Sequence, residues 1–91
     1  MTQEINRKLA DLLFSKTWQG IVPNFCSDPR LVIEAMRERE DWREFYIWAS
    51  DHGRALDYNS QGTVFIRMSI AMDKTGRLAL LAIEWLGKNK A

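Results

Sequence analysis

The sequence predicts an α+β fold in which a small antiparallel β-sheet of two or three strands is sandwiched between helices, in the order α-α-β-β(-β)-α. Apolar residues recur at helical spacing towards both ends of the chain, whereas its middle shows the two-residue alternation of β-strands. With 91 residues, of which 46% are hydrophobic, the chain has material for one core. We therefore expect a single α/β/α sandwich domain over residues 1–91.

The first predicted helix is amphipathic and begins at Thr2, whose hydroxyl can cap its first turn. It should end near Lys16, because Gly20 and Pro23 break any continuation in the segment KTWQGIVPNFCSD. That segment carries so many apolar side chains that we expect it to pack against the core as an ordered crossing.

Asp28 followed by Pro29 predicts the start of a second helix, because the carboxylate can accept the first amide hydrogens and proline suits the first helical position. The mixed charges at residues 37–41 are typical of a solvated helix end. A binding patch there is the less favoured interpretation.

Two runs with strand-like alternation occupy residues 44–50 and 63–71. A turn is predicted at residues 51–54 and a second at residues 60–62. Residues 55–59 between them are either a short middle strand or part of a wide loop, so the sheet has two strands in a hairpin or three in a meander.

One face of this predicted sheet is core, since Val64 and Ile66 belong to an apolar row. The other face would carry a row of aromatic and basic side chains: Tyr46, Trp48, Phe65 and Arg67. Such a row resembles in its chemistry the stacking platforms that bind bases or nucleotides. The favoured alternative is that a helix covers these rings as ordinary core.

His52 and Arg54 lie in the predicted turn at the end of the sheet. They complete the set of candidate ligand-binding residues. A lone histidine beside a glycine is most often an exposed turn residue, and a ligand contact is its functional alternative. We expect any site to lie at this turn or at a subunit boundary rather than on the broad sheet face.

The last helix follows a cap at Asp73 or Thr75, and its body LALLAIEWL is apolar nearly all round. A helix of this kind needs cover on more than one side. It either lies between the sheet and another helix or meets a second subunit, which predicts a homo-oligomer joined through Leu80, Ile83 and Trp85.

Composition excludes several classes of function. A net charge of +1 disfavours nucleic acid as a partner, and no apolar run approaches the length of a membrane span. One cysteine and one histidine cannot form a zinc signature, and no glycine-rich phosphate loop follows either strand. We expect no metal, no cofactor and no catalytic residues, and Cys26 is predicted to be a small buried hydrophobe. The absence of a signal core in the N-terminal residues favours a reducing cytosol.

Several stretches resemble the phage ABA-sandwich domain family of small phage and prophage proteins. They are INRKLADLLF with Trp18 after it, PNFCSDPRLVIEAMRER, and DKTGRLALLAIEWL. The middle stretch DHGRALDYNSQGTVF departs from the shorter hairpin of that family. The resemblance implies a sheet between helices and an accessory role in the cytosol of a bacterial host, and it supplies no catalytic residues.

These observations favour a non-enzymatic binding or interaction module. Its expected partner is a host protein or a second copy of the chain. The alternative is a protein that binds or sequesters a nucleotide-like small molecule, on the aromatic sheet face or in a cleft between subunits.

Overall fold

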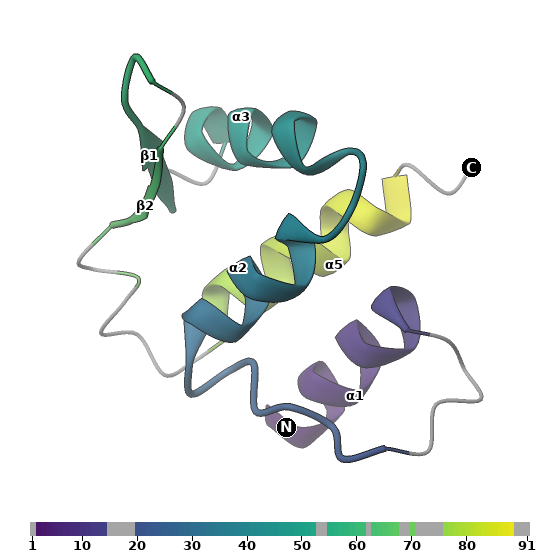
Figure 1. The fold of residues 1–91 in the computed structure, drawn as a ribbon. Helices are drawn as coiled ribbons and strands as arrows, with labels where there is room; N and C mark the ends of the chain where they lie inside the picture. Colours follow the sequence, from purple (N-terminus) through teal and green to yellow (C-terminus); the bar gives the residue numbers. More distant parts are fainter. Residues whose placement is uncertain are drawn as a thin grey trace.

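The computed structural model describes residues 2–14, 20–52, 55–61, 63–67, 70 and 76–88. Its elements in chain order are α1 (Thr2–Leu13), α2 (Pro29–Arg37), α3 (Trp42–His52), β1 (Leu56–Tyr58), β2 (Val64–Ile66) and α5 (Arg77–Lys88) (Figure 1). The predicted α+β class is confirmed, and the order over the described residues is α-α-α-β-β-α. Predictions made for Lys16, Trp18, Asp73 and Thr75 fall outside the described residues.

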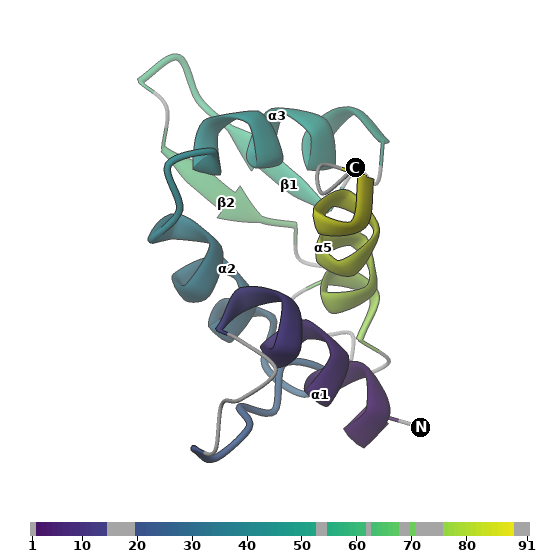
Figure 2. The same ribbon diagram turned by 90° about the vertical axis from the view of Figure 1, so that its right-hand side faces the viewer.

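Helix α5 lies at the centre of the helical part of the molecule, with α1, α2 and α3 packed against it (Figures 1 and 2). The buried residues of α5 include two alanines, which allow close approach of neighbouring helices, and three larger side chains: Leu78, Ala79, Ala82, Trp85 and Leu86. The nearly all-round apolar surface predicted for this helix is therefore largely covered within the chain.

Helix α2 begins as its sequence predicts. The Asp28 carboxylate accepts a hydrogen bond from the backbone N–H of Arg30 at 3.1 Å, and Pro29 occupies the first helical position. The helix ends at Arg37, within the run of charges, where Arg39 then pairs with Asp41 through two hydrogen bonds of 2.8 and 3.1 Å. The charged run is thus the end of the helix, and two of its charged side chains form an ion pair with each other.

The strand predicted over residues 44–50 is wrong, because this segment is the helix α3. The apolar residues of this segment fit both the alternation of a strand and the spacing of a helix, because most of its side chains are aromatic or small. Phe45, Tyr46 and Ala49 are buried on one face of the helix, and Trp42 is partly buried beside them. Phe45 meets Trp85 of α5 edge-on, with ring centroids 5.4 Å apart. Burial against α5 outweighs the strand propensity of the aromatic residues.

The sheet consists of β1 and β2, paired antiparallel with Leu56 opposite Ile66 and Tyr58 opposite Val64. Residues 55–59, which the sequence left between a strand and a loop, thus contain β1. The side chain of Asn59 shapes the turn, because its Oδ1 accepts hydrogen bonds of 2.9 Å from the N–H groups of Gln61 and Thr63.

The two faces of this sheet have different surroundings. Leu56, Tyr58, Val64 and Ile66 share the inner face by register, and Figures 1 and 2 show α2 and α3 on that side. The outer face carries the exposed residues Asp57, Phe65 and Arg67. In place of a sheet between two helical layers, the described residues form a sheet with helices on one face.

A buried junction ties α1, the crossing segment before α2 and the start of α5 together. Asn6 is only 7% exposed; its amide donates to Asn24 Oδ1 and its Oδ1 accepts from the Cys26 N–H, both at 3.0 Å. Cys26 in turn packs against Gly76, which has φ of 86° in the left-handed region. The crossing segment is packed in this part as the sequence predicts.

We expect Gly76→Ala to destabilise the fold by about 2–4 kcal/mol, since a Cβ there combines left-handed strain with overpacking. That Cβ would lie 2.5 Å from Cys26 Sγ. Gly87→Ala is the matched control, because nothing lies within 4 Å of its added Cβ. In the helix the control should gain up to about 1 kcal/mol. Urea denaturation measures both, and equal effects of the two substitutions would contradict the packing described.

A second prediction concerns the buried amide. Asn6→Ala removes the partner of the buried Cys26 N–H and should cost about 1–3 kcal/mol in the free energy of unfolding. Gln3→Ala, at an exposed position of the same helix, should change it by less than about 0.5 kcal/mol. Thermal unfolding of the two variants beside the parent protein gives the comparison, and an Asn6→Ala protein as stable as Gln3→Ala would exclude the junction as a source of stability.

Candidate functional site

The aromatic row predicted on one sheet face does not exist, because its members lie on different elements. Tyr46 and Trp48 belong to α3, whereas Phe65 and Arg67 are on or next to β2 on the outer face of the sheet. Tyr46 is buried, with its ring 5.3 Å from that of Tyr58 and 5.4 Å from that of Trp42. Tyr46 is therefore a core residue, but it lies on a helix. The favoured alternative, a helix covering all four side chains on a sheet face, is wrong, because Phe65 is 50% exposed.

The remaining members of that row have local partners. Trp48 is half-buried, with its ring 6.4 Å from that of Phe45 and 5.9 Å from the Lys88 ammonium. Arg67 Nη2 donates to Asp57 Oδ1 at 2.9 Å across the two strands. Phe65, 50% exposed, lies on the same outer face, so this face presents one aromatic ring beside an ion pair.

His52 is the last residue of α3, rather than part of a turn between strands. Its side chain and Arg54 lie outside the described residues. The roles of His52 and Arg54 as ligand contacts therefore stay predictions.

The three residues predicted to join subunits differ in their accessibility. Leu80 is 49% exposed and Ile83 is half-buried, whereas Trp85 is only 6% exposed and belongs to the core. Trp85 is therefore covered by the chain's own helices, and Leu80 and Ile83 are the part of the predicted interface that reaches the surface.

Within the described ranges, no group of three or more His, Cys, Asp and Glu side chains gathers where it could hold a metal ion. None of the described helices has the length and apolar character needed to cross a membrane. Cys26 is 1% exposed, in agreement with its prediction as a buried hydrophobe.

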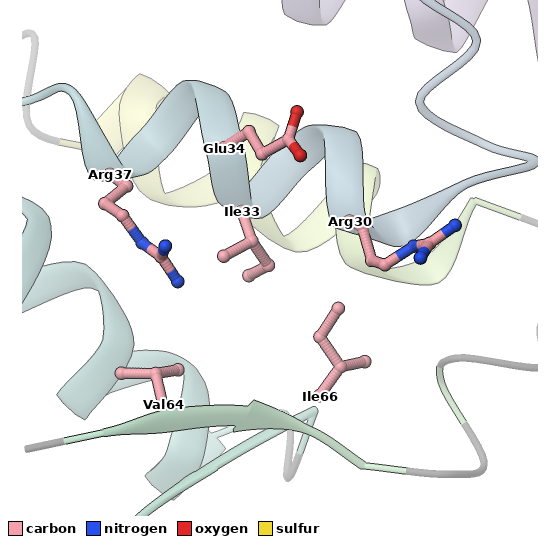
Figure 3. A pocket seen from close by; sticks show the side chains of 6 residues that line it. All are labelled: Arg30, Ile33, Glu34, Arg37, Val64 and Ile66. Atoms are coloured by element: carbon pink, nitrogen blue, oxygen red, sulfur yellow. The ribbon is translucent and has the colours of Figure 1, made fainter.

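A groove of about 390 Å³ between α2 and β2 combines apolar and charged groups. It is lined by one apolar side chain of α2, two apolar side chains of β2 that face it, and three charged residues of α2: Arg30, Ile33, Glu34, Arg37, Val64 and Ile66. Figure 3 shows Ile33 pointing from α2 towards the strand, and Val64 and Ile66 pointing from β2 towards the helix.

The apolar floor of this groove is the part of the inner sheet face that α3 leaves open. Helix α3 packs on β1, whose Leu56 is fully buried. Val64 and Ile66 of β2 are only partly buried, although they share that face. A surface of this kind gains free energy when an apolar group covers it.

Arginine side chains stand at the two ends of the groove. Arg37 lies towards Val64, with its Cζ 5.9 Å from the centre of the Trp42 ring, and Arg30 lies towards the Ile66 end (Figure 3). Arg30 Nε also contacts Asp28 Oδ1 at 3.2 Å, in a pair whose side chains are 79% and 39% exposed. Such an exposed pair contributes little and can be exchanged for another carboxylate. Glu34 points away from the strand in Figure 3.

Two other hollows are built differently. One is lined only by residues of the charged turn after α2, Glu38, Arg39, Glu40 and Asp41, of which Arg39 and Asp41 already pair with each other. The other, of about 250 Å³, lies over Asn6 between α1 and Val22 and is closed below by the buried junction. Neither offers apolar groups from two opposed elements.

Sequence reasoning assigned Val64 and Ile66 to the core and gave Arg30 and Ile33 no functional role. The alternating pattern of the strand does identify Val64 and Ile66, the two residues that form the floor of the groove. The sequence contains no signal that places α2 opposite that strand. This position depends on how α2 and α3 pack on α5.

Comparisons with protein-family models, with curated proteins and with solved structures give no match for this chain.

The burial of Cys26 leads to a prediction about its thiol. An aromatic disulfide reagent should label Cys26 only slowly in the native protein, because Gly76 and its neighbours cover the sulfur, and rapidly in guanidinium chloride. Gly76→Ala should speed labelling of the native protein by loosening this contact. The absorbance of the released thiolate follows the reaction, and equal rates in buffer and in denaturant would contradict the burial of the thiol.

Proposed function

We propose that this protein is a non-enzymatic binding module whose binding site is the groove between α2 and β2. The observation that carries the proposal is the pair of opposed apolar surfaces, Ile33 on one side and Val64 with Ile66 on the other, around an open volume of about 390 Å³. Ligand sites are typically concave, apolar and bordered by a few charged groups, and their volumes begin at roughly 300 Å³.

The charged groups of the groove support binding rather than chemistry. Arginine guanidinium groups stay protonated and cannot act as general bases near neutral pH. Their role in such a position is to orient an acceptor, as they do for carboxylates and phosphates. Glu34 lies on the exposed side of the helix. The other charged residues that line the groove are these two arginines, so the lining offers Glu34 no second acid or base for catalysis.

An accessory role in a bacterial cytosol, which the resemblance to phage ABA-sandwich proteins implies, is compatible with a module of this kind and belongs to the same proposal. The proposal includes pairing of two copies through Leu80 and Ile83, since both side chains reach the surface. Light scattering of the purified protein measures the number of copies directly.

Backbone amide NMR spectra test the site. Titration with N-acetyl-leucine amide should shift the signals of Ile33, Val64 and Ile66, because its side chain resembles the apolar group that the groove would cover. Ile66→Ser should weaken the affinity measured from these shifts by at least about threefold. A change of this size corresponds to the loss of a small part of an apolar contact. Phe65→Ser is the matched control on the opposite face of the same strand and should leave the affinity unchanged.

Shifts that spread away from α2 and β2, or that fall equally in Ile66→Ser and Phe65→Ser, would refute the groove as the site. Adenosine and guanosine monophosphates form a second arm of the experiment. Perturbation by nucleotides around Phe65 and Arg67 on the outer sheet face, with no effect of N-acetyl-leucine amide on the groove, would favour a nucleotide-like ligand instead.

A further inference from the structure

We infer that the occupant of the groove is an extended peptide segment that pairs with the free edge of β2 and carries acidic side chains on either side of an apolar one. The inference rests on the proposed function, because it names the class of ligand for the same groove. It follows from three features of the groove: the backbone of β2, the side chains of its floor and the two arginines.

The hydrogen bonds between the strands show which backbone groups of β2 remain open. Arg67 N–H donates to the Ala55 carbonyl at 3.0 Å, and Asn59 N–H donates to the Thr63 carbonyl at 3.1 Å. Hydrogen-bonded pairs alternate with non-bonded pairs along an antiparallel ladder. The pairs of Leu56 with Ile66 and of Tyr58 with Val64 are therefore of the non-bonded kind. The N–H and C=O groups of Val64 and Ile66 consequently point away from β1.

No described strand pairs with this second edge of β2, since the sheet has the order β1-β2. Figure 2 shows β2 between β1 and α2, so the open edge is on the side of the helix. An unpaired edge is a template for addition of a strand from another chain. Val64 and Ile66 thus offer both the backbone groups and the side chains that an added strand requires.

The floor of the groove determines which side chains such a strand would carry. Alternate residues of an added strand face the same side as Val64 and Ile66, towards Ile33 of α2. The middle one of these residues lies above the apolar floor. An apolar side chain there would contact Ile33, which is 6% exposed, and cover the open parts of Val64 and Ile66. The residues between them face the opposite side of the sheet, where Phe65 and Arg67 are exposed to solvent.

The arginines determine the ends of the segment. Arg30 and Arg37 are seven positions apart, which corresponds to about 10 Å along a helix axis. Residues four apart in an extended strand are separated by roughly 13 Å, and both point to the same face. The flexible arginine side chains span the difference, and Arg30 extends outward from the helix in Figure 3. The complementary pattern is acidic–x–apolar–x–acidic.

The test uses the full chain and three capped peptides. The first, Ac-Ser-Glu-Thr-Leu-Thr-Glu-Ser-amide, matches this pattern. The second has lysine in place of both glutamates. The third carries a methyl group on the backbone nitrogens of its leucine and its two glutamates, the residues that lie opposite Val64 and Ile66 when the peptide pairs antiparallel, so these nitrogens cannot donate hydrogen bonds to β2. NMR titration gives the dissociation constants, and amide hydrogen exchange of the complex gives the protection of each backbone N–H.

The acidic peptide should bind at least about tenfold tighter than the lysine peptide, since two like charges would otherwise meet the arginines. Its binding should slow exchange of the Val64 and Ile66 amides, while the methylated peptide binds more weakly. Arg37→Gln should weaken binding of the acidic peptide by about fivefold. Arg67→Gln on the outer sheet face is the matched control and should change it by less than twofold, within the scatter expected for a group outside the site.

The inference fails, with the proposed function intact, if N-acetyl-leucine amide occupies the groove but the acidic and lysine peptides bind equally, or if Val64 and Ile66 gain no protection. If neither the amide nor any peptide affects the groove, both proposals fail. A dimer in light scattering without peptide, together with protection of the same two amides, would assign the edge to a second copy of the chain and overturn the inference.

Discussion

The apolar surface of α5 is the constraint on which the rest of the structure depends. A helix with so few polar positions is stable in water only when several other elements cover it. Helices α1, α2 and α3 supply that cover, and the sheet joins the fold through the contact of β1 with α3. The edge-on pair of Phe45 and Trp85 joins α3 to α5, and such an aromatic pair adds about 0.5–1.5 kcal/mol beyond its buried area.

The elements that the sequence predicted correctly are those with local signals. Asp28 and Pro29 define the start of α2 without help from the rest of the fold, and the alternation around Val64 identifies β2. The strand predicted over residues 63–71 is too long, because β2 ends at Ile66 and Ile70 is helical. Residues 42–52 contain no such local signal, because aromatic and small side chains satisfy the helical and the strand period together. Their structure is decided by the contacts of Phe45 and Tyr46 with residues distant in the sequence, which a local pattern does not contain.

The candidate site shows the same division. Its floor was visible in the sequence as an apolar strand row, but its opposite wall was not. Once residues 42–52 form a helix, α3 takes the inner face of β1 and leaves Val64 and Ile66 partly open towards α2. The groove thus depends on an element that was predicted wrongly, and its two arginines border Val64 and Ile66 only because of the position that α2 takes in the complete fold.

The contact between α1 and α5 has a consequence for the folding of the newly made chain. These helices are the first and the last of the described elements, yet they pack directly against each other. On the ribosome, α1 is synthesised long before its partner has emerged, so its apolar stripe with Leu9 and Ala10 must wait without native cover. Contacts of such high sequence separation form late and slow the folding of small domains.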